Sequence, residues 1–362
     1  IKIKKSKMGI SELLRKLGPI TEPTHIRNFA KKSAAIDVSG WLYKGLYACA
    51  ANETDNKSDL YLNYPLKMIA LLRSFEIEPI VVFDGRQLKE KEKILEARNK
   101  LRETNIEKAN YLLHVGNEDE SKKYMKRALK IKSRMLNTLI DILKQINVKI
   151  IVAPYEADSQ LAYLVRKNYA DFAISEDSDL LALGVNNIVM KLSPEGNCMN
   201  INFKKFKDAP LENYSDQIVK DIKNMSYVNF LELCVMSGCD YLPSIKGFGI
   251  KTGLNLFNQH KKMEAVFHEM KFIEKFKTKI PENYLENAKK AVCILFYQTV
   301  FDPKENKLVS MNDYKSEKDD DLERTFCKDH INKFVSQLIY KKNIPDFTNG
   351  IIPSNTCISI TI

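Results

Sequence analysis

Paired cysteines are missing from this chain. Its seven cysteines are an odd number, lie scattered, and form neither a CxxC pair nor a cluster with histidine. This usage predicts a reducing intracellular compartment and no zinc site. The cysteines are Cys49, Cys198, Cys234, Cys239, Cys293, Cys327 and Cys357.

Long apolar runs are also absent. No stretch reaches the ~18 apolar residues that a membrane-spanning helix needs. Residues 1–7 are basic but lack the apolar run of a secretory signal. The sequence therefore predicts a soluble protein, and it contains no evident internal repeat.

Positive charge, by contrast, is in excess. Fifty-seven Lys and Arg residues against 46 Asp and Glu give a net charge of +11 and a pI of about 9.0. This balance favours a polyanionic partner such as nucleic acid, although an ordinary basic surface explains it equally well. With 44% hydrophobic residues, the 362-residue chain can bury one large core or two modest ones. A single domain is the simplest interpretation.

Short apolar runs alternate with longer helical patterns. This alternation is typical of an α/β fold, in which helices flank a parallel sheet. After Tyr227, a predicted helix ends in a glycine-spaced segment over 237–253, and amphipathic stretches continue to about residue 342. From residue 343 onward, Pro, Asn, Gly and Ser predict a loosely packed tail. The candidate strands are 34–38, 80–83, 149–152, 172–175 and 187–192.

The segment 86–145 is dense in Lys, Arg and Glu and contains the turn Gly116-Asn117. Its length of about sixty residues is far more than a crossover between parallel strands requires. We expect two or more charged helices that project from the sheet. The alternative is a helical hairpin packed on the surface.

Acidic residues follow the predicted strands at the points where they end. In an open α/β sheet these carboxyl ends line the ligand crevice, so acids from separate segments should converge there. One further acid, Asp240, comes from the glycine-spaced segment. The strand-end acids are Asp37, Asp84, Glu156, Asp158, Glu176, Asp177 and Asp179.

Clustered carboxylates repel one another unless cations or protons neutralise them. Oxygen ligands without cysteine or histidine select Mg²⁺ or Mn²⁺ over zinc. Two such ions ~4 Å apart can activate water and stabilise the leaving oxygen, which is the chemistry of phosphodiester hydrolysis. Taken singly, an Asp after a strand is more often a helix cap or turn former. The acidic run 317–321 follows no apolar strand, and we assign it to a solvated loop.

Four segments resemble, in order, the motifs of the structure-specific 5′ nucleases. They are Val82-Phe83-Asp84-Gly85, the segment 152–164 with Tyr155-Glu156-Ala157-Asp158, Glu176-Asp177-Ser178-Asp179-Leu180-Leu181, and Ser237-Gly238-Cys239-Asp240-Tyr241-Leu242-Pro243. Within this family, the chain resembles the exonuclease 1 branch more than the flap endonucleases. The resemblance rests on Met8-Gly9-Ile10, Trp41-Leu42-Tyr43-Lys44-Gly45, Phe301-Asp302-Pro303 and Asp158. At the position of Asp158, the flap endonucleases usually carry a second Glu. The resemblance covers roughly residues 8–342.

The resemblance implies a PIN-like core with a helical arch and a helix–two-turn–helix element. It also implies that Lys91 and Arg98 are a catalytic basic pair at the foot of the arch. The two residues are seven apart, a spacing that would place them on one face of a helix. Without the resemblance, solvated surface charges would be the better interpretation. The implied regions are 8–105 with the start of the arch, 106–145 with the rest of it and the following helix, 146–342 including the helix–two-turn–helix at 228–262, and the tail 343–362. The implied Mg²⁺ ligands are Asp37, Asp84, Glu156, Asp158, Asp177, Asp179 and Asp240.

The segment Gly247-Phe248-Gly249 lies between two helical patterns, where missing side chains let backbone N–H groups approach a phosphate. Lys251 adds positive charge. A lone GxG is usually only a tight turn, but its spacing from Asp240 favours the functional interpretation. In the family this element holds duplex DNA, partly through K⁺ bound by carbonyls. Those carbonyls would belong to Ser237, Ser244 and Phe248.

Three features depart from the family pattern. Seven residues precede Met8, where the family normally begins. The exonuclease branch tends to place a Tyr two residues after the first Asp and a His six after it, where this chain has Ser39 and Tyr43. We therefore expect Tyr43, and not Ser39, to contact DNA as a wedge.

The resemblance implies a Mg²⁺-dependent 5′→3′ double-stranded DNA exonuclease with 5′-flap endonuclease activity, acting in the nucleus in mismatch repair, end resection and recombination. The expected partners are double-stranded DNA with a 5′ end, nick, gap or flap, and mismatch-repair proteins that bind a C-terminal tail outside this chain. No membrane partner is expected, and we expect a monomer.

Three alternatives remain open. The first is a flap endonuclease of replication, which would favour a bifurcated flap. The second is a non-catalytic DNA-binding scaffold, which should have lost one or more of the seven acids. The third is a metal-dependent ribonuclease of the same sheet type, which would not need the glycine-rich clamp.

Overall fold

The computed structural model describes residues 10, 13–49 and 59–312, with the side chain of Lys93 left out. Several sequence features lie outside the described residues: residues 1–7, Met8-Gly9, the acidic run 317–321, the amphipathic stretches after residue 312 and the tail 343–362. No helix in the described part is both long and apolar enough to span a bilayer.

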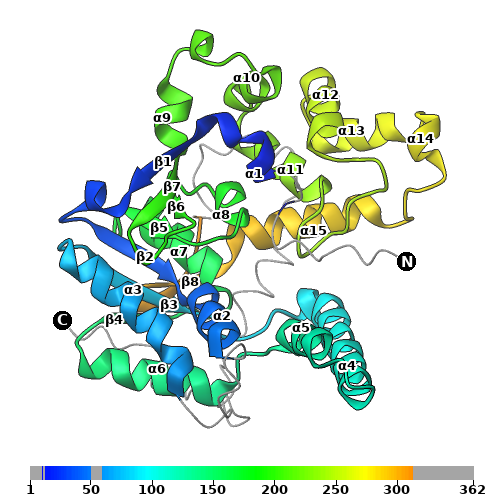
Figure 1. Ribbon diagram of the computed structural model, residues 1–362. Helices are drawn as coiled ribbons and strands as arrows, with labels where there is room; N and C mark the ends of the chain where they lie inside the picture. The colour runs from blue at the N-terminus through cyan, green and yellow to red at the C-terminus, as the bar shows by residue number, and fades with distance from the viewer. Residues whose placement is uncertain (1–9, 11–12, 50–58, 313–362) are drawn as a thin grey trace.

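A seven-stranded sheet forms the centre of the molecule, with the strand order β1-β7-β6-β5-β2-β3-β4 (Figure 1). The strands from β6 to β4 run parallel and overlap the five predicted strands, which confirms the parallel α/β core. The sequence does not predict the antiparallel edge strands β1 and β7, because both are polar and half-exposed. The strands are β1 (Thr21–His25), β2 (Ser33–Asp37), β3 (Glu78–Phe83), β4 (Lys149–Val152), β5 (Phe172–Ile174), β6 (Asn187–Met190) and β7 (Asn197–Asn202).

Alternate residues of the parallel strands enter two hydrophobic cores, one on each face of the sheet. In β2, Ala35 enters the first core and Ile36 the second; in β3, Val82 and Val81 divide in the same way. Burial on both faces explains why these strands are continuous apolar runs. The first core is covered by α7 (Ala157–Arg166), α8 (Asp179–Ala182), α11 (Tyr227–Met236), α12 (Ile250–His260), α13 (Met263–Met270) and α15 (Tyr284–Tyr297), and the second by α2 (Val38–Cys49), α3 (Asn63–Ser74) and α6 (Ser133–Gln145).

Smaller elements complete the described chain. The hairpin of β8 (Thr299–Asp302) and β9 (Lys307–Ser310) forms a separate two-stranded sheet. The remaining helices are α1 (Leu13–Lys16), α9 (Phe203–Asp208), α10 (Gln217–Asn224) and α14 (Glu274–Lys277), with 3-10 turns at Gly18–Ile20, Ile26–Phe29, Asp59–Leu62, Lys89–Lys91 and Leu211–Asn213.

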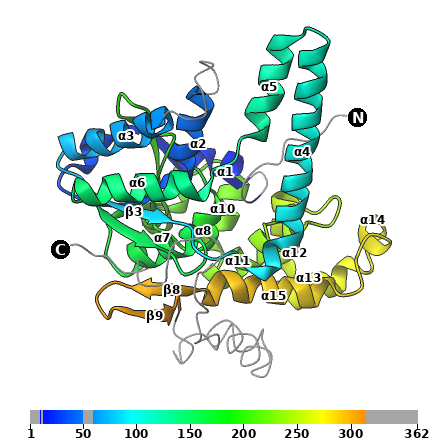
Figure 2. The same cartoon turned by 90° about the horizontal axis from the view of Figure 1, so that it is seen from below.

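The charged segment after β3 forms a hairpin of α4 (Glu92–His114) and α5 (Glu118–Ala128), which stands away from the body of the protein (Figure 2). Gly116 turns the chain with a φ of +79°, and Asn117 accepts the N–H of Glu120 to begin α5. The hairpin confirms the projecting arch. The third helix of the segment, α6, instead packs on the sheet, because Leu139, Ile140 and Leu143 give it a buried apolar face.

The predicted helix–two-turn–helix consists of α11 and α12 with the connection 237–249 between them. Gly238 and Gly247 adopt φ values of +104° and +94°, which favour glycine. Gly253 lets the two helices approach closely, because a Cβ there would lie 2.3 Å from Cδ1 of Leu233. The glycines of this segment thus serve backbone geometry and close packing.

One buried acid of α11 makes stability depend on pH. Burial, together with the nearby carboxylate of Glu264, raises the pKa of Glu232 from 4.5 to about 8. The folded state therefore favours the neutral acid, and its contribution to stability is present below pH 4.5 and lost as the pH rises toward 8.

We expect Glu232→Gln, which keeps an acceptor for the N–H of Met263, to stabilise the protein on the order of 3 kcal/mol more at pH 8 than at pH 5. Thermal or urea unfolding across this range measures the difference. Glu286→Gln is the control, since Glu286 is an exposed acid of α15 that does not contribute to the raised pKa of Glu232. Equal effects of Glu232→Gln at both pH values would contradict the burial argument.

Candidate active site

Acidic side chains gather at the carboxyl edge of the parallel strands. Asp37 ends β2 and Asp84 follows β3. The N–H of Ser39 donates to Asp37 Oδ1 at 3.0 Å and its Oγ donates to Asp84 Oδ2 at 3.2 Å, while the N–H of Ala157 donates to Asp84 Oδ1 at 2.9 Å. Donors at the starts of α2 and α7 thus orient both carboxylates toward one edge.

The turn between β5 and α8 contributes Asp177 and Asp179. Ser175 Oγ donates to Asp37 Oδ2 at 3.2 Å and accepts the N–H of Asp177 at 3.1 Å, which ties this turn to β2. The N–H of Asp179 donates to Asp177 Oδ1 at 2.9 Å. Asp179 Oδ1 also accepts the N–H of Ile10 at 2.9 Å, so the start of the described chain reaches the site.

Burial and mutual repulsion disfavour the ionised forms of these acids. Burial, then the charge of Asp84, raises the pKa of Asp37 to about 7, and burial, then Asp177, raises that of Asp179 to about 8. Asp158, in the first turn of α7, has a pKa well above its usual range because it is buried among the same carboxylates. The cluster therefore concentrates negative charge that needs compensation.

Lys91 and Arg98, at the foot of the arch, face the acids. Lys91 Nζ lies 2.5 Å from Glu156 Oε1 and 3.2 Å from Asp240 Oδ2. Arg98 Nη2 lies 3.1 Å from Asp240 Oδ2 and 3.2 Å from its Oδ1. Burial alone would raise the pKa of Asp240, but Lys91 and Arg98 lower it. The structure thus brings all seven predicted acids and both predicted cations into one site.

Tyr241 belongs to the same site, although the sequence reasoning assigned it no role. Its hydroxyl donates to Glu156 Oε2, and its ring lies 4.9 Å from Lys91 Nζ. Its position next to Asp240 was the available signal. Glu176, by contrast, points away: it pairs with Lys44 at 3.1 Å and accepts the N–H of Lys191.

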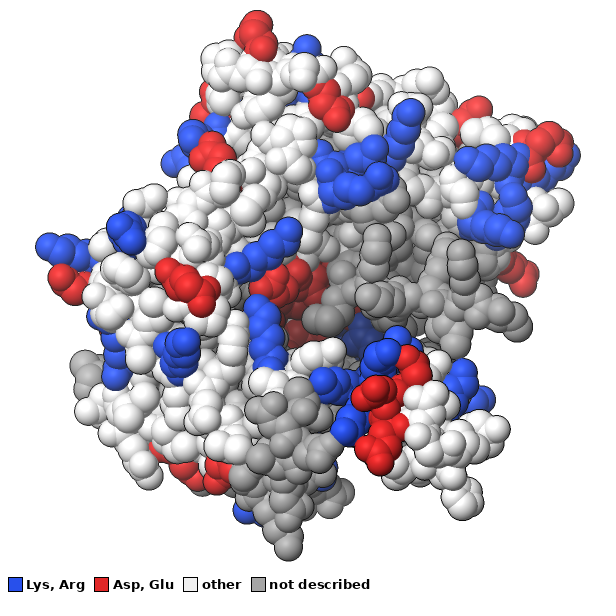
Figure 3. All heavy atoms as spheres, in the orientation of Figure 1, with Lys and Arg blue, Asp and Glu red and all other residues white. Residues whose placement is uncertain are grey.

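Figure 3 shows acidic side chains in a hollow that Lys and Arg side chains flank. The seven predicted ligands offer only oxygen atoms, a donor set that fits Mg²⁺ or Mn²⁺. Within the described ranges, no three His, Cys, Asp or Glu side chains are arranged to hold an ion as they stand. The assignment of this site to Mg²⁺ or Mn²⁺ therefore rests on the oxygen donors and on the excess of carboxylates.

The predicted DNA-contacting residues outside the acid cluster lie on two elements, α2 and the start of α12. Tyr43 lies on α2, 38% exposed, and its hydroxyl accepts from Arg102 Nη2 at 3.4 Å. Gly249 caps the start of α12, with Lys251 in its first turn. Gly247 lies in the turn before them, against Lys275 of α14.

The predicted K⁺ carbonyls come from three positions of the α11–α12 connection. Ser237 ends α11, and Gly238 approaches Ser244 so closely that a Cβ would lie 3.2 Å from the Ser244 nitrogen. Phe248 is buried and its N–H donates to the carbonyl of Ile245. Ser237 and Ser244 therefore lie near each other, and the K⁺ site stays a prediction.

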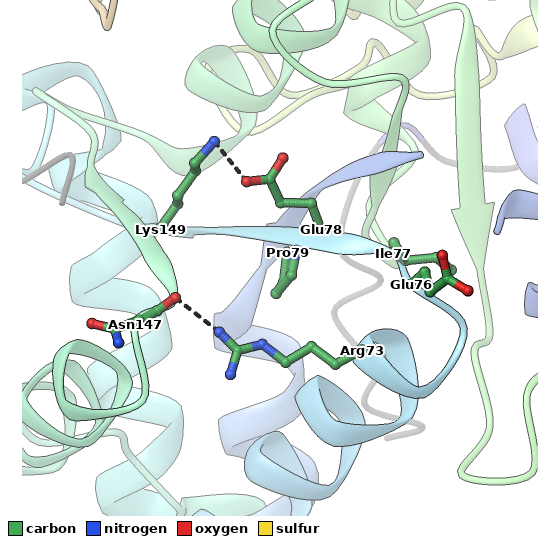
Figure 4. Close-up of a pocket in the computed structure, with 7 residues that line it drawn as sticks. All are labelled: Arg73, Glu76, Ile77, Glu78, Pro79, Asn147 and Lys149. Atoms are coloured by element: carbon green, nitrogen blue, oxygen red, sulfur yellow. Dashed lines mark hydrogen bonds and ion pairs between the residues drawn. The ribbon is translucent and has the colours of Figure 1, made fainter. Parts of the chain in front are cut away.

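A second hollow of about 500 Å³ lies at the opposite, amino end of β3 and β4 (Figure 4). Three of its four charged side chains are engaged with neighbouring groups. Lys149 Nζ lies 2.6 Å from Glu78 Oε1, and Arg73 Nη2 donates to the carbonyl of Asn147 at 2.8 Å. This hollow does not gather reactive groups as the carboxyl edge does.

The chain matches two domains of one protein family. The XPG N-terminal domain matches residues 8–105, and the XPG I-region matches residues 147–240. All nine residues of the carboxylate and cation site lie inside these two ranges.

Its relatives include proteins named exonuclease 1 and a DNA damage-inducible protein. Exonuclease 1 of Xenopus laevis is 36% identical over 310 residues, which cover 85% of this chain and 41% of that protein. DNA damage-inducible protein DIN7 of Saccharomyces cerevisiae is 31% identical over 306 residues, covering 84% of this chain and 69% of that protein. The chain spans about two fifths of the length of the animal exonuclease 1 relatives that it matches.

Solved structures confirm the fold. The catalytic core of Rad2 in complex with DNA substrate aligns with a TM-score of 0.56 at 19% identity, covering 78% of this chain and 85% of that one. The Holliday junction-resolving enzyme GEN1, solved with product DNA and a Mg²⁺ ion, aligns with a TM-score of 0.53 at 18% identity, covering 82% and 66%. The chain has this fold, matches both family domains, and is similar to exonuclease 1 and to DIN7 over most of its length. It therefore belongs to the XPG-type family of 5′ nucleases, on its exonuclease 1 branch.

Proposed function

We propose that this protein is a Mg²⁺-dependent 5′→3′ double-stranded DNA exonuclease that also cuts 5′ flaps. The observation that carries the proposal is the set of seven carboxyl groups at one sheet edge, faced by Lys91 and Arg98 from the foot of the arch. A non-catalytic scaffold would not need to maintain so unfavourable a cluster. The relatives named exonuclease 1 support the same activity.

The ions would be held by Asp37, Asp84, Glu156, Asp158, Asp177, Asp179 and Asp240. When bound, two Mg²⁺ ions supply an activated water and compensate the charge of the scissile phosphate and the leaving oxygen. The hydrogen bonds from Ser39 and Ser175 fix the orientation of Asp37 and Asp84 before the ions bind. The Mg²⁺ ion in the GEN1 structure supports this cofactor.

Lys91 and Arg98 supply positive charge that faces the same reaction centre. Both are held in place by ion pairs, and Lys91 also lies against the ring of Tyr241. Cations placed before the reaction begins stabilise a phosphate that gains charge in the transition state, and they need no reorganisation to do so. We therefore assign them to the scissile phosphate.

Duplex DNA would be held away from the reaction centre by α12 and its preceding turn. Gly247, Gly249 and Lys251 would contact a phosphate, with K⁺ bound by the carbonyls of Ser237, Ser244 and Phe248 as a further part of the clamp. Tyr43 would act as a wedge near the cut. We further propose nuclear DNA repair by a monomer, with mismatch-repair proteins as partners.

The choice of substrate tests the proposal directly. We expect labelled duplex with a nick or a recessed 5′ end to be degraded from the 5′ end in Mg²⁺, a 5′ flap to be cut, and single-stranded DNA to be a poor substrate. Strong preference for a bifurcated flap would favour a replication-type flap endonuclease. Binding without cleavage of any substrate would favour a scaffold.

The clamp is tested by Gly249→Val. Gly249 has an extended φ of −156°, and a Cβ there would meet no atom within 4 Å, so the fold should accept the change. The side chain should hold a duplex phosphate away from the backbone N–H groups of α12. We expect a higher KM on long duplexes and a nearly normal rate at saturating DNA.

Shortening the duplex until it no longer reaches α12 should erase the difference between variant and wild type. Gly18→Val is a matched control, because a Cβ at Gly18 also meets no atom within 4 Å and Gly18 lies in a different element. Equal impairment of Gly249→Val on short and long duplexes would make the segment a structural turn only.

A further inference from the structure

Helix α2 presents two tyrosines one turn apart on its solvent side, Tyr43 and Tyr47. They are 38% and 56% exposed, whereas Trp41, Leu42 and Leu46 of the same helix are buried. Each meets a cation of the arch. Tyr43 accepts from Arg102 of α4, and Lys126 Nζ of α5 lies 4.8 Å from the centre of the Tyr47 ring.

These contacts join the arch to the body of the protein away from its base. In both ribbon views α5 lies on the side of the hairpin that faces α2 (Figures 1 and 2). Other cation–ring contacts of the hairpin stay within it: Lys108 of α4 lies 5.5 Å from the Tyr124 ring of α5. The Tyr47–Lys126 contact is therefore of a different kind, since it restrains the hairpin as a whole.

The restraint bears on the reaction centre through α4. Arg98 and Arg102 lie four residues apart on one face of this helix, the first paired with Asp240 and the second with Tyr43. A tilt of the hairpin away from α2 would carry both arginines in the same direction. Whatever holds α5 against α2 therefore also holds Arg98 over the acids.

We propose that Tyr47 and Lys126 form a latch that fixes the arch against α2 and so positions Lys91 and Arg98 for catalysis. The latch rests on the proposed nuclease function, but its two residues touch neither the acids nor the catalytic cations in the structure. They are positioning residues. A cation over an exposed aromatic ring contributes a modest free energy, which corresponds to about a two- to five-fold change in the population of the closed arch.

Four variants test the latch. Tyr47→Leu removes the aromatic face, Lys126→Met removes the charge at similar length, and their double variant closes a mutant cycle. Tyr47→Phe keeps the face and should restore wild-type behaviour. Lys108→Met is the matched control, because it breaks a cation–ring contact inside the hairpin without touching α2.

We expect Tyr47→Leu and Lys126→Met each to lower the single-turnover rate at saturating DNA about two- to five-fold, with Kd changed less. The double variant should be no slower than either single one, and Lys108→Met and Tyr47→Phe should match wild type. In the DNA-free protein, hydrogen exchange of α5 should be faster in Tyr47→Leu than in Tyr47→Phe.

If the double variant lost rate by the product of the two single losses, the latch would be overturned. Two residues that act through one shared contact cannot lose that contact twice. A rise in Kd with unchanged exchange in the DNA-free protein would overturn it in favour of direct DNA contacts. If wild type cuts no substrate, the proposed function fails, and the latch then stands or falls on the exchange difference between Tyr47→Leu and Tyr47→Phe.

Discussion

Replacing Asp179 with alanine is expected to abolish cleavage while DNA binding stays within a few-fold of wild type. Asp179 is buried at the carboxyl edge, where its neighbours Asp177 and Asp240 already repel it. Its retention there makes sense as a metal ligand. The clamp at Gly249 and Lys251 is unaffected by the change, so phosphate contacts that hold the duplex should persist.

Single-turnover cleavage of end-labelled duplex in Mg²⁺ measures the rate, and fluorescence anisotropy without Mg²⁺ measures binding. Asp179→Asn should be as inactive as Asp179→Ala, although it keeps an acceptor for the N–H of Ile10. Glu176→Ala is the matched control, an acid of the same turn that pairs with Lys44 outside the cluster. A rate above about a tenth of wild type for Asp179→Ala would refute the metal assignment, since lost ligation should cost well over tenfold.

Replacing Lys91 and Arg98 together with alanine should lower the single-turnover rate about 100-fold or more, with a much smaller change in DNA affinity. Removing one preorganised group that stabilises transition-state charge costs about 10²–10³-fold in other enzymes. Both cations here face the acids from a fixed position at the foot of the arch. Their effect should therefore fall on the chemical step rather than on binding.

The measurement should be repeated at saturating Mg²⁺. If the cations only offset the charge of Glu156 and Asp240, more Mg²⁺ would restore the rate, and their assignment to the scissile phosphate would be wrong. Lys89→Ala combined with Lys100→Ala is the control, because both are exposed cations near the foot of the same helix. This pair should cut at a nearly normal rate.

The five parallel strands and the edge of the sheet that carries the acids could be predicted from the local sequence pattern alone. A strand buried on both faces must be a continuous apolar run, so all five parallel strands could be located within a few residues. Parallel strands point their carboxyl ends to one edge, so acids that follow them converge whatever the details of packing. Asp37, Asp84, Asp177 and Asp179 required no tertiary information to be grouped, although their role as metal ligands stays a prediction.

Strands that are stabilised mainly by pairing with other strands could not be predicted in this way. The edge strands β1 and β7 are polar and exist because they pair with each other and with β6. The hairpin of β8 and β9 is likewise defined by its own pairing. Local hydrophobic periodicity reports burial, and β1 and β7 have too little of it to be recognised. Strand β8 is buried but has only four residues, which is too short a run to show a period.

The sequence by itself therefore determined the parallel core and the convergence of acids at its carboxyl edge, since each follows from spacing along one segment. Lys91 does not share a helix with Arg98 as expected, because it ends a 3-10 turn and α4 begins at Glu92. Only the tertiary structure decided which acids those cations face, that Tyr241 supports Glu156, and that Lys126 reaches Tyr47. These contacts join residues far apart in the chain. They depend on the tilt and packing of whole helices, which no local spacing encodes.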